Sequence, residues 1–226
     1  MKTLKYIIVC ITFLSPFYAQ SQYKSMGSWN IMNVKFKINE KWSVYTEGQL
    51  RSLKFYNNFH YYEYQAGVNY KLSQNMSIAL AAGDYNTYKE GGNFVMPMKN
   101  NEFRTGLQIT LSQPFTNINV EHRYRAEQRF TSNGFRNRFR YRFNTKIPLG
   151  KELPISNLYA IINNEIFFTN IAPYFERNRF MCGAGYKFDK HFTLQMGYLH
   201  QFDYKITDET GRSFIQVALL FEFDKK

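Results

Sequence analysis

Alternation of apolar and polar residues is the strongest pattern in the chain. From 135 to 147 the apolar residues share one parity, and the other parity holds four arginines and Lys146. Successive side chains of a β-strand point to opposite sides, so a strand separates the two sets, whereas a helix would scatter the arginines around its axis. The segment is therefore predicted to be a strand with one apolar and one basic face.

The same two-residue period recurs along the chain and predicts eleven strands. Each is about as long as a membrane-spanning strand, which needs roughly 9 to 11 residues. The predicted strands cover 28–38, 42–53, 62–72, 76–88, 101–111, 118–130, 135–147, 158–168, 175–188, 192–202 and 215–223. A single-chain bacterial barrel is expected to have an even number of strands, so one of the eleven predictions should be wrong, first of all at the N-terminal end.

The connections between these strands alternate in length. Longer polar loops are predicted at 86–100 and 203–211, and 148–157 is a longer connection on the short side. Short turns are predicted near 39–41, 73–75, 113–116 and 189–191. Outer-membrane barrels have this pattern, with their short turns on the periplasmic side. The predicted fold is all-β, a single antiparallel transmembrane β-barrel of about 10–12 strands.

The N-terminus has the features of a secretory signal peptide. Lys2 and Lys5 precede an apolar run over 6–19, which is too short for a membrane-spanning helix. Cleavage after Ser21 would place small residues at the two positions that signal peptidase reads, so the signal peptide is predicted over 1–21 and the barrel over 22–226. Cleavage removes Cys10 and leaves Cys182 without an intramolecular disulfide partner.

Alternation alone does not decide whether the aromatic face meets lipid or fills a soluble, lipocalin-like barrel. Eleven strands enclose more volume than an eight-stranded barrel, whose interior side chains just fill it. The last strand is alternating and aromatic and closes with Phe221 and Phe223, similar to the signal that the outer-membrane assembly machinery recognises, although Asp224 and two lysines follow it. We therefore expect an outer-membrane location, with membrane lipid and the assembly machinery as partners. A soluble periplasmic carrier remains an alternative.

Arginine and glutamate gather on the polar faces of four neighbouring predicted strands. The candidate cluster comprises Glu121, Arg123, Arg125, Glu127, Arg129, Arg136, Arg138, Arg140, Arg142, Glu165, Arg177 and Arg179. If all of these side chains face the lumen, they form either a plug of paired charges or a basic pore lining that selects anions. Because nine arginines face three glutamates, a conducting barrel is expected to prefer anions.

Other chemistry is only weakly indicated. A lipid-modifying barrel hydrolase is an alternative function, and it needs a serine activated by a histidine on the outer face. His122 has no serine within two residues and His191 lies in a predicted turn, which leaves His60 and His200 as candidates. No catalytic residue and no cofactor is predicted. No metal site is predicted either, since the four histidines lack zinc-binding spacings. The run of arginines and aromatic residues over 136–143 is an alternative nucleic-acid surface, but export argues against that partner. The net charge is +12 and falls to +10 without Lys2 and Lys5, so the mature chain stays strongly basic.

Several segments of the chain are similar, in order and spacing, to one known family. They are 121–129, 135–141, 163–168, 177–179 and 197–198, and Trp29, Trp42 and 49–51 also fit. The family they resemble is domain of unknown function 2490. The resemblance implies an outer-membrane barrel and no assigned activity.

Overall fold

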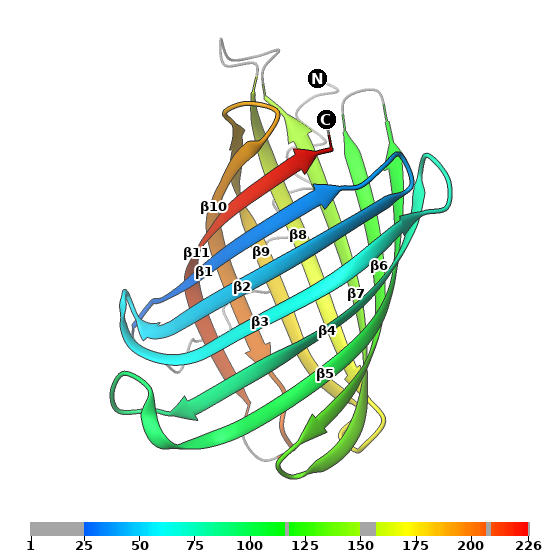
Figure 1. Cartoon of the computed structure of the whole chain (residues 1–226). Coiled ribbons are helices and arrows are strands. Elements are labelled where there is room, and N and C mark those ends of the chain that lie inside the picture. Colours follow the sequence, from blue (N-terminus) through cyan, green and yellow to red (C-terminus); the bar gives the residue numbers. More distant parts are fainter. Residues whose placement is uncertain (1–24, 116–117, 150–156, 207–208, 226) are drawn as a thin grey trace, which may run out of the picture.

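The computed structural model describes residues 25–115, 118–149, 157–206 and 209–225, which form one closed β-barrel (Figure 1). The strands are β1 Gly27–Lys37, β2 Trp42–Lys54, β3 Asn57–Lys71, β4 Met76–Lys89, β5 Val95–Pro114, β6 Asn119–Thr131, β7 Gly134–Pro148, β8 Leu158–Thr169, β9 Phe175–Lys187, β10 Phe192–Asp203 and β11 Thr210–Asp224. These residues contain no helix long and apolar enough to cross a membrane. The predicted signal peptide over 1–21 lies outside the described residues.

The barrel closes through a parallel pair of strands. Consecutive strands pair antiparallel, whereas β1 and β11 lie side by side and parallel, from Gly27 opposite Phe214 to Lys37 opposite Asp224 (Figure 1). With eleven strands that reverse direction at every turn, the first and last must run the same way. The prediction of an all-β barrel of about 10–12 strands is confirmed, and its strands pair antiparallel except at this closure. The expectation of an even strand number was wrong. The N-terminal strand, which was doubted, is present as β1.

At the end of the barrel opposite the short turns, several strands extend further than predicted. The predicted loop over 86–100 is mostly strand, because β4 and β5 stay paired from Asn86 opposite Asn101 up to Lys89 opposite Val95. Residues 95–98 are an apolar run, Val-Met-Pro-Met, and the residues up to 102 are polar, so this stretch shows no alternation. The prediction consequently placed the start of β5 at 101 instead of Val95, and the end of β4 at 88 instead of Lys89.

Short turns join the strands at the other end. In the turn after β9, the Asp189 carboxylate accepts hydrogen bonds from the backbone N–H groups of His191 and Phe192 at 2.6 and 2.8 Å, and these bonds hold the pKa of Asp189 below its usual range. Asn39 accepts from two backbone N–H groups in the same way after β1. Of the other predicted connections at this end, residues 116–117 and 150–156 lie outside the described part.

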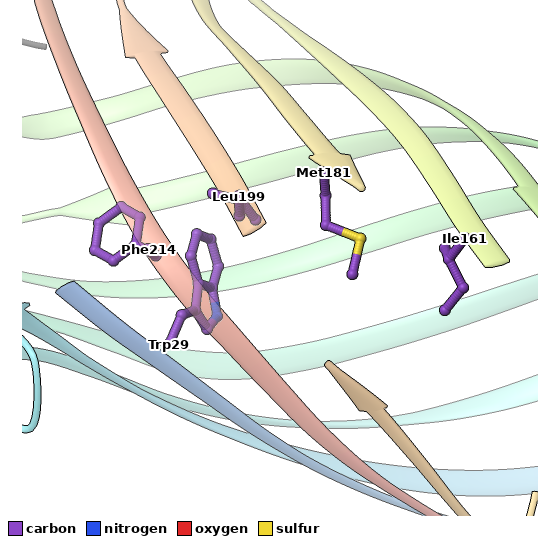
Figure 2. Close-up of a cluster of buried hydrophobic side chains, with 5 residues drawn as sticks. All are labelled: Trp29, Ile161, Met181, Leu199 and Phe214. Carbon is purple, nitrogen blue, oxygen red and sulfur yellow. The ribbon is translucent and has the colours of Figure 1, made fainter. Parts of the chain in front are cut away.

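The two parities of each strand face opposite sides, as the alternation predicts. On β7, Phe139 points outward and is 52% exposed, whereas the neighbouring Arg138 points inward and is 2% exposed. The interior also contains an apolar patch from β1 and β8 to β11, formed by Trp29, Ile161, Met181, Leu199 and Phe214 (Figure 2). Charged side chains line the rest of the middle of the lumen.

Candidate functional site

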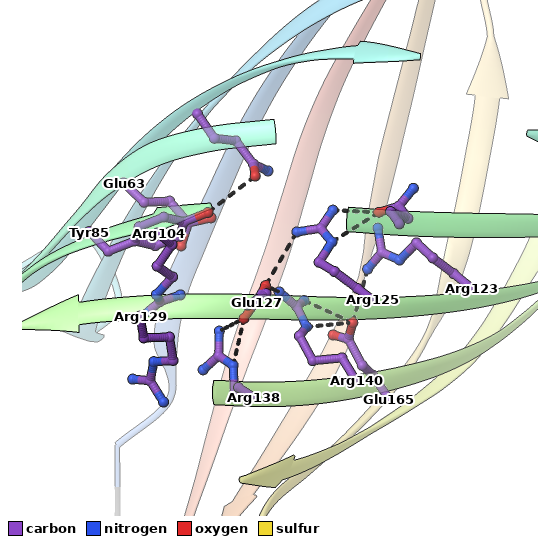
Figure 3. Close-up of polar contacts among 12 residues, drawn as sticks. Glu63, Tyr85, Arg104, Arg123, Arg125, Glu127, Arg129, Arg138, Arg140 and Glu165 are labelled. Carbon is purple, nitrogen blue, oxygen red and sulfur yellow. Dashed lines mark hydrogen bonds and ion pairs between the residues drawn. The ribbon is translucent and has the colours of Figure 1, made fainter. Parts of the chain in front are cut away.

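The inward-facing charges of β5 to β9, with Glu47 and Arg51 of β2, Glu63 of β3 and Asp203 of β10, form what we call the charged band. Figure 3 shows the part of it around Glu127 and Glu165. Its centre is Glu127 on β6, which lies directly opposite Arg138 on β7. Arg138 approaches one carboxylate oxygen of Glu127 through Nη2 at 2.5 Å and Nε at 2.7 Å, and Arg140 donates to the other oxygen at 2.7 Å. Glu127 is only 3% exposed, so these guanidinium groups replace its hydration.

A second carboxylate, that of Glu165, pairs with further arginines of the β6–β7 hairpin. The strand register places Arg125 opposite Arg140, so like charges face each other across the pair. Glu165 on β8 lies among them: its Oε1 accepts from Arg140 Nη2 at 2.8 Å and from Arg123 Nη2 at 2.9 Å. Arg140 therefore bridges Glu127 and Glu165, and Arg179 of β9 reaches the other oxygen of Glu165 at 3.7 Å.

Further ion pairs cross the lumen. Glu102 on β5 accepts from Arg104 at 2.6 and 3.0 Å and from Arg129 on β6. Arg129 also contacts Glu176 on β9 at 3.2 Å, and Arg138 contacts the same carboxylate at 3.5 Å. Two strands, β7 and β8, separate β6 from β9 in the wall. These side chains consequently extend through the interior instead of lying along the wall.

Aromatic rings hold several of the guanidinium groups. Arg51 lies between the rings of Trp29 and Tyr61, at 3.5 and 3.9 Å from their centroids, and donates to Glu63 at 2.9 Å. Phe167, fully buried at 0% exposure, has four guanidinium groups within 4.6 to 5.8 Å of its ring centroid. The planar, weakly hydrated guanidinium group suits such stacking, which a lysine ammonium would not reproduce.

The cavities show how the charged band divides the lumen. A cavity of about 520 Å³ lies at the end with the long strand extensions, and one of about 450 Å³ lies toward the short turns. The space between them is about 120 Å³ and is lined by the band, including Arg51, Arg138, Arg140 and Glu165. A larger hollow of about 1140 Å³ is lined mainly by the outer sides of β1 to β7. Its lining is largely apolar and includes one charged residue of the band, Glu127.

All twelve residues of the predicted cluster occupy inward-facing positions of β6 to β9. Eleven of them take part in ion pairs; Arg177 does so with Asp203, outside the predicted set. Arg136 has no ion-pair partner among the described residues and lines the 520 Å³ cavity. Eleven of the twelve predicted residues are therefore ion-paired members of the band, and Arg136 is not.

Sequence reasoning missed seven members of the band, which lie on β2, β3, β5, β9 and β10. They are Glu47, Arg51, Glu63, Glu102, Arg104, Glu176 and Asp203. Counting them, eleven arginines meet eight carboxylates among the described residues, an excess of three positive charges in place of the predicted six. The parity of Glu102 and Arg104 in the predicted strand 101–111 was an available signal, as was that of Glu63 in 62–72.

The four histidines have different surroundings. His122 Nδ1 lies 2.8 Å from the hydroxyl of Tyr141, and His191 Nδ1 lies 2.8 Å from the carbonyl oxygen of Glu222. His60 lines the 520 Å³ cavity, and its buried Nδ1 has no hydrogen-bond partner in the described chain. His200 Nδ1 lies 3.1 Å from Ser213 Oγ. In the part of the chain that the structure describes, no three potential ligands are grouped to hold a metal ion.

Comparison with known proteins gives a family and no activity. A family model described as "Protein of unknown function (DUF2490)" matches residues 26–212, which is most of the chain. No match to a curated protein is found.

Proposed function

The chain belongs to the DUF2490 family, and we propose that this member is an integral outer-membrane β-barrel whose lumen is closed at mid-height by the charged band. The observation that carries the closure is the set of ion pairs that skip strands, above all Arg129 on β6 with Glu176 on β9. Side chains that meet across a barrel occupy the space through which a solute would pass.

The distribution of side chains supports a membrane location. Large apolar side chains such as Phe135, Phe139 and Leu80 are exposed on the outside, and the buried interior is rich in charges. A soluble carrier barrel has the reverse arrangement, with apolar residues inside and polar residues outside. In a bilayer the exposed aromatic residues contact lipid, and the paired charges remain in the lumen.

Fractionation of cells expressing the full chain tests the location. The protein should sediment with outer membranes, need detergent for extraction, and migrate differently on gels before and after heating. Phe139→Arg should reduce the yield of the heat-modifiable form, because a cation at the lipid midplane of such a barrel costs about 2–4 kcal/mol. Phe139→Leu is the matched control and should assemble normally. Recovery of the parent in the soluble periplasmic fraction would contradict the proposal.

A closed lumen is favourable only when its charges are paired. Removing charges from water is costly, and removal of one partner from a buried pair leaves the other uncompensated. In the band, Glu127, Glu165 and Glu102 each accept from at least two arginines. This shared pairing supports a structural plug that stays closed at rest.

An anion-preferring channel is the second candidate function. The cavities of about 520 and 450 Å³ on the two sides of the band and the excess of arginines favour it. Planar-bilayer recording separates the two: a plugged barrel should give no stable unit current, whereas a channel should give currents with an anion-selective reversal potential. Any such selectivity should fall as salt rises, since screening shortens to about 8 Å near physiological ionic strength. Changing Arg138 and Arg140 to Gln should then shift permeability toward cations. Stable currents in the parent would overturn the plug.

A further inference from the structure

Three hydrogen-bonding side chains meet on the outside of the barrel, away from the lumen. His200 on β10 lies directly opposite Ser213 on β11, and Tyr198 precedes His200 by two residues on the same face. His200 Nδ1 is 3.1 Å from Ser213 Oγ, and the Tyr198 hydroxyl is 2.7 Å from the same oxygen. On the inner side of these strands, Leu199 and Phe214 pack in the apolar patch and hold both strands in place.

The hydrogen bonds form a consistent chain of donors and acceptors. A serine nucleophile needs the His200 tautomer that carries its proton on Nε2. In that tautomer the Ser213 hydroxyl donates to His200 Nδ1, and Ser213 Oγ accepts from the Tyr198 hydroxyl. His200 Nε2 is buried and has no hydrogen-bond partner in the described chain. A serine hydroxyl within hydrogen-bond reach of a histidine nitrogen is the arrangement that activates a serine nucleophile.

The place of this group along the strands indicates its substrate. His200 lies three residues before the end of β10, and Ser213 lies three residues after the start of β11, at the barrel end opposite the short turns. Nearby rings, those of Phe175, Phe202 and Tyr204, have centroids 5.9 to 6.5 Å apart, and aromatic residues commonly mark a membrane interface. In the proposed orientation this level corresponds to the outer leaflet, where the ester bonds of membrane lipids lie.

We propose that Ser213 and His200 form a catalytic dyad that hydrolyses an acyl ester of a membrane lipid. This inference goes beyond the plugged barrel and rests on the proposed membrane location. Ser213 Oγ attacks the ester carbonyl carbon while its proton moves to His200 Nδ1. The bond to the alkoxy oxygen then breaks, and His200 gives that proton to the departing oxygen. An acyl-serine and a lysolipid result.

Water completes the cycle. It attacks the acyl-serine carbonyl, its proton passes to His200 and then to Ser213 Oγ, and a fatty acid leaves. Tyr198 is a positioning residue, because its hydroxyl lies 2.7 Å from Ser213 Oγ and acts on the reaction only through that oxygen. Tyr198→Phe should accordingly lower kcat and leave KM unchanged, whereas a merely structural role would lower the amount of folded barrel.

The experiment uses the full mature chain, reconstituted and checked for heat-modifiable migration. A fluorophosphonate probe should label the parent at Ser213, and fatty acid should be released from vesicles of phosphatidylethanolamine or from vesicles containing lipid A. The vesicle type that reacts identifies the source of the ester. Ser213→Ala should abolish both signals, and His200→Gln should lower the rate by about 10²- to 10⁴-fold, the usual contribution of a general base.

Two control variants change a hydroxyl residue and a histidine that also face outward but are hydrogen-bonded to other partners. Thr105 is an outward-facing hydroxyl bonded to Gln128 at 3.2 Å, and His122 is an outward-facing histidine bonded to a tyrosine. Thr105→Ala and His122→Gln should keep parental rates. The water-soluble ester p-nitrophenyl butyrate reports on the dyad even if the membrane location is wrong. A folded parent that neither labels nor cleaves any of these esters, or labelling that persists in Ser213→Ala, would overturn the inference.

Discussion

The charged band and the apolar patch stabilise the same lumen by different means. In the band, Glu127 and Glu165 are each surrounded by arginines from neighbouring strands, and the bonds have fixed directions and short distances. In the patch, Ile161, Leu199 and Phe214 contribute apolar side chains that form no hydrogen bonds, and Met181 accepts one long hydrogen bond from Asn163 at 3.4 Å. The patch lies next to the parallel closure of β1 with β11, and the band covers much of the opposite wall.

The two regions differ in how their stability changes when one side chain is removed. A buried carboxylate shared by several arginines cannot be removed without leaving those cations unpaired, so the band is stable only as a set. An apolar side chain can be shortened at a cost set by the cavity it leaves. Trp29 joins the regions, since it belongs to the patch and stacks against Arg51 and Arg179 at 3.5 and 4.7 Å.

The largest effect is expected for Glu127→Gln. The substitution keeps the shape of the side chain but leaves Arg138 and Arg140 without their shared charge, so the free energy of unfolding should fall by about 3–5 kcal/mol. Urea unfolding in lipid vesicles, followed by tryptophan fluorescence, measures the change. Glu121→Gln is the control, because its pair with Arg142 spans 3.4 Å between side chains that are 27% and 29% exposed. It should cost under about 1 kcal/mol, and equal costs at both sites would contradict a shared buried network.

Met181→Ala tests the apolar patch and should have the next largest effect. Met181 is 1% exposed, so its truncation leaves a cavity and should lower the free energy of unfolding by about 3 kcal/mol. Because no charge is lost, the cost should be the same in low and high salt. Met196 on the outer face of β10 is 49% exposed, and Met196→Ala is the matched control. A strong salt dependence for Met181→Ala would show that the two regions are not separate.

Much of the fold could be predicted because each strand has to separate two environments. The arginines of β7 alternate with aromatic residues, and this parity was enough to assign its inner and outer faces. The parallel closure was missed because a general rule of even strand number was applied to a chain whose own pattern indicated eleven strands. The start of β5 was missed because the apolar run over 95–98 does not alternate.

The interior was less predictable. Glu102 and Glu176 lie on strands that are not neighbours, and only the register and reach of the side chains reveal that both contact Arg129. The apolar patch was missed because strands near the closure have apolar residues on both faces, as with inward Leu199 beside outward Tyr198. His200 was a candidate from its place near a strand end, but its pairing with Ser213 depends on the β10–β11 register.

A smaller effect is expected for Arg51→Lys, which tests whether the two regions are coupled. A lysine keeps a positive charge beside Glu63 but loses the planar contacts with Trp29 and Tyr61. The free energy of unfolding should therefore fall by about 1–2 kcal/mol.

A double-mutant cycle of Arg51→Lys with Trp29→Phe, measured by urea unfolding in vesicles, isolates the stacking of Arg51 on Trp29. If the stack carries the cost, the two substitutions together should cost less than the sum of their separate costs, by about 0.5 kcal/mol or more. Arg104→Lys, which loses a stack on Tyr85 at 3.7 Å, is the matched control and should add its cost independently to that of Trp29→Phe. Additive costs for Arg51 and Trp29 would mean that the charged band and the apolar patch are only neighbours, each stable without the other.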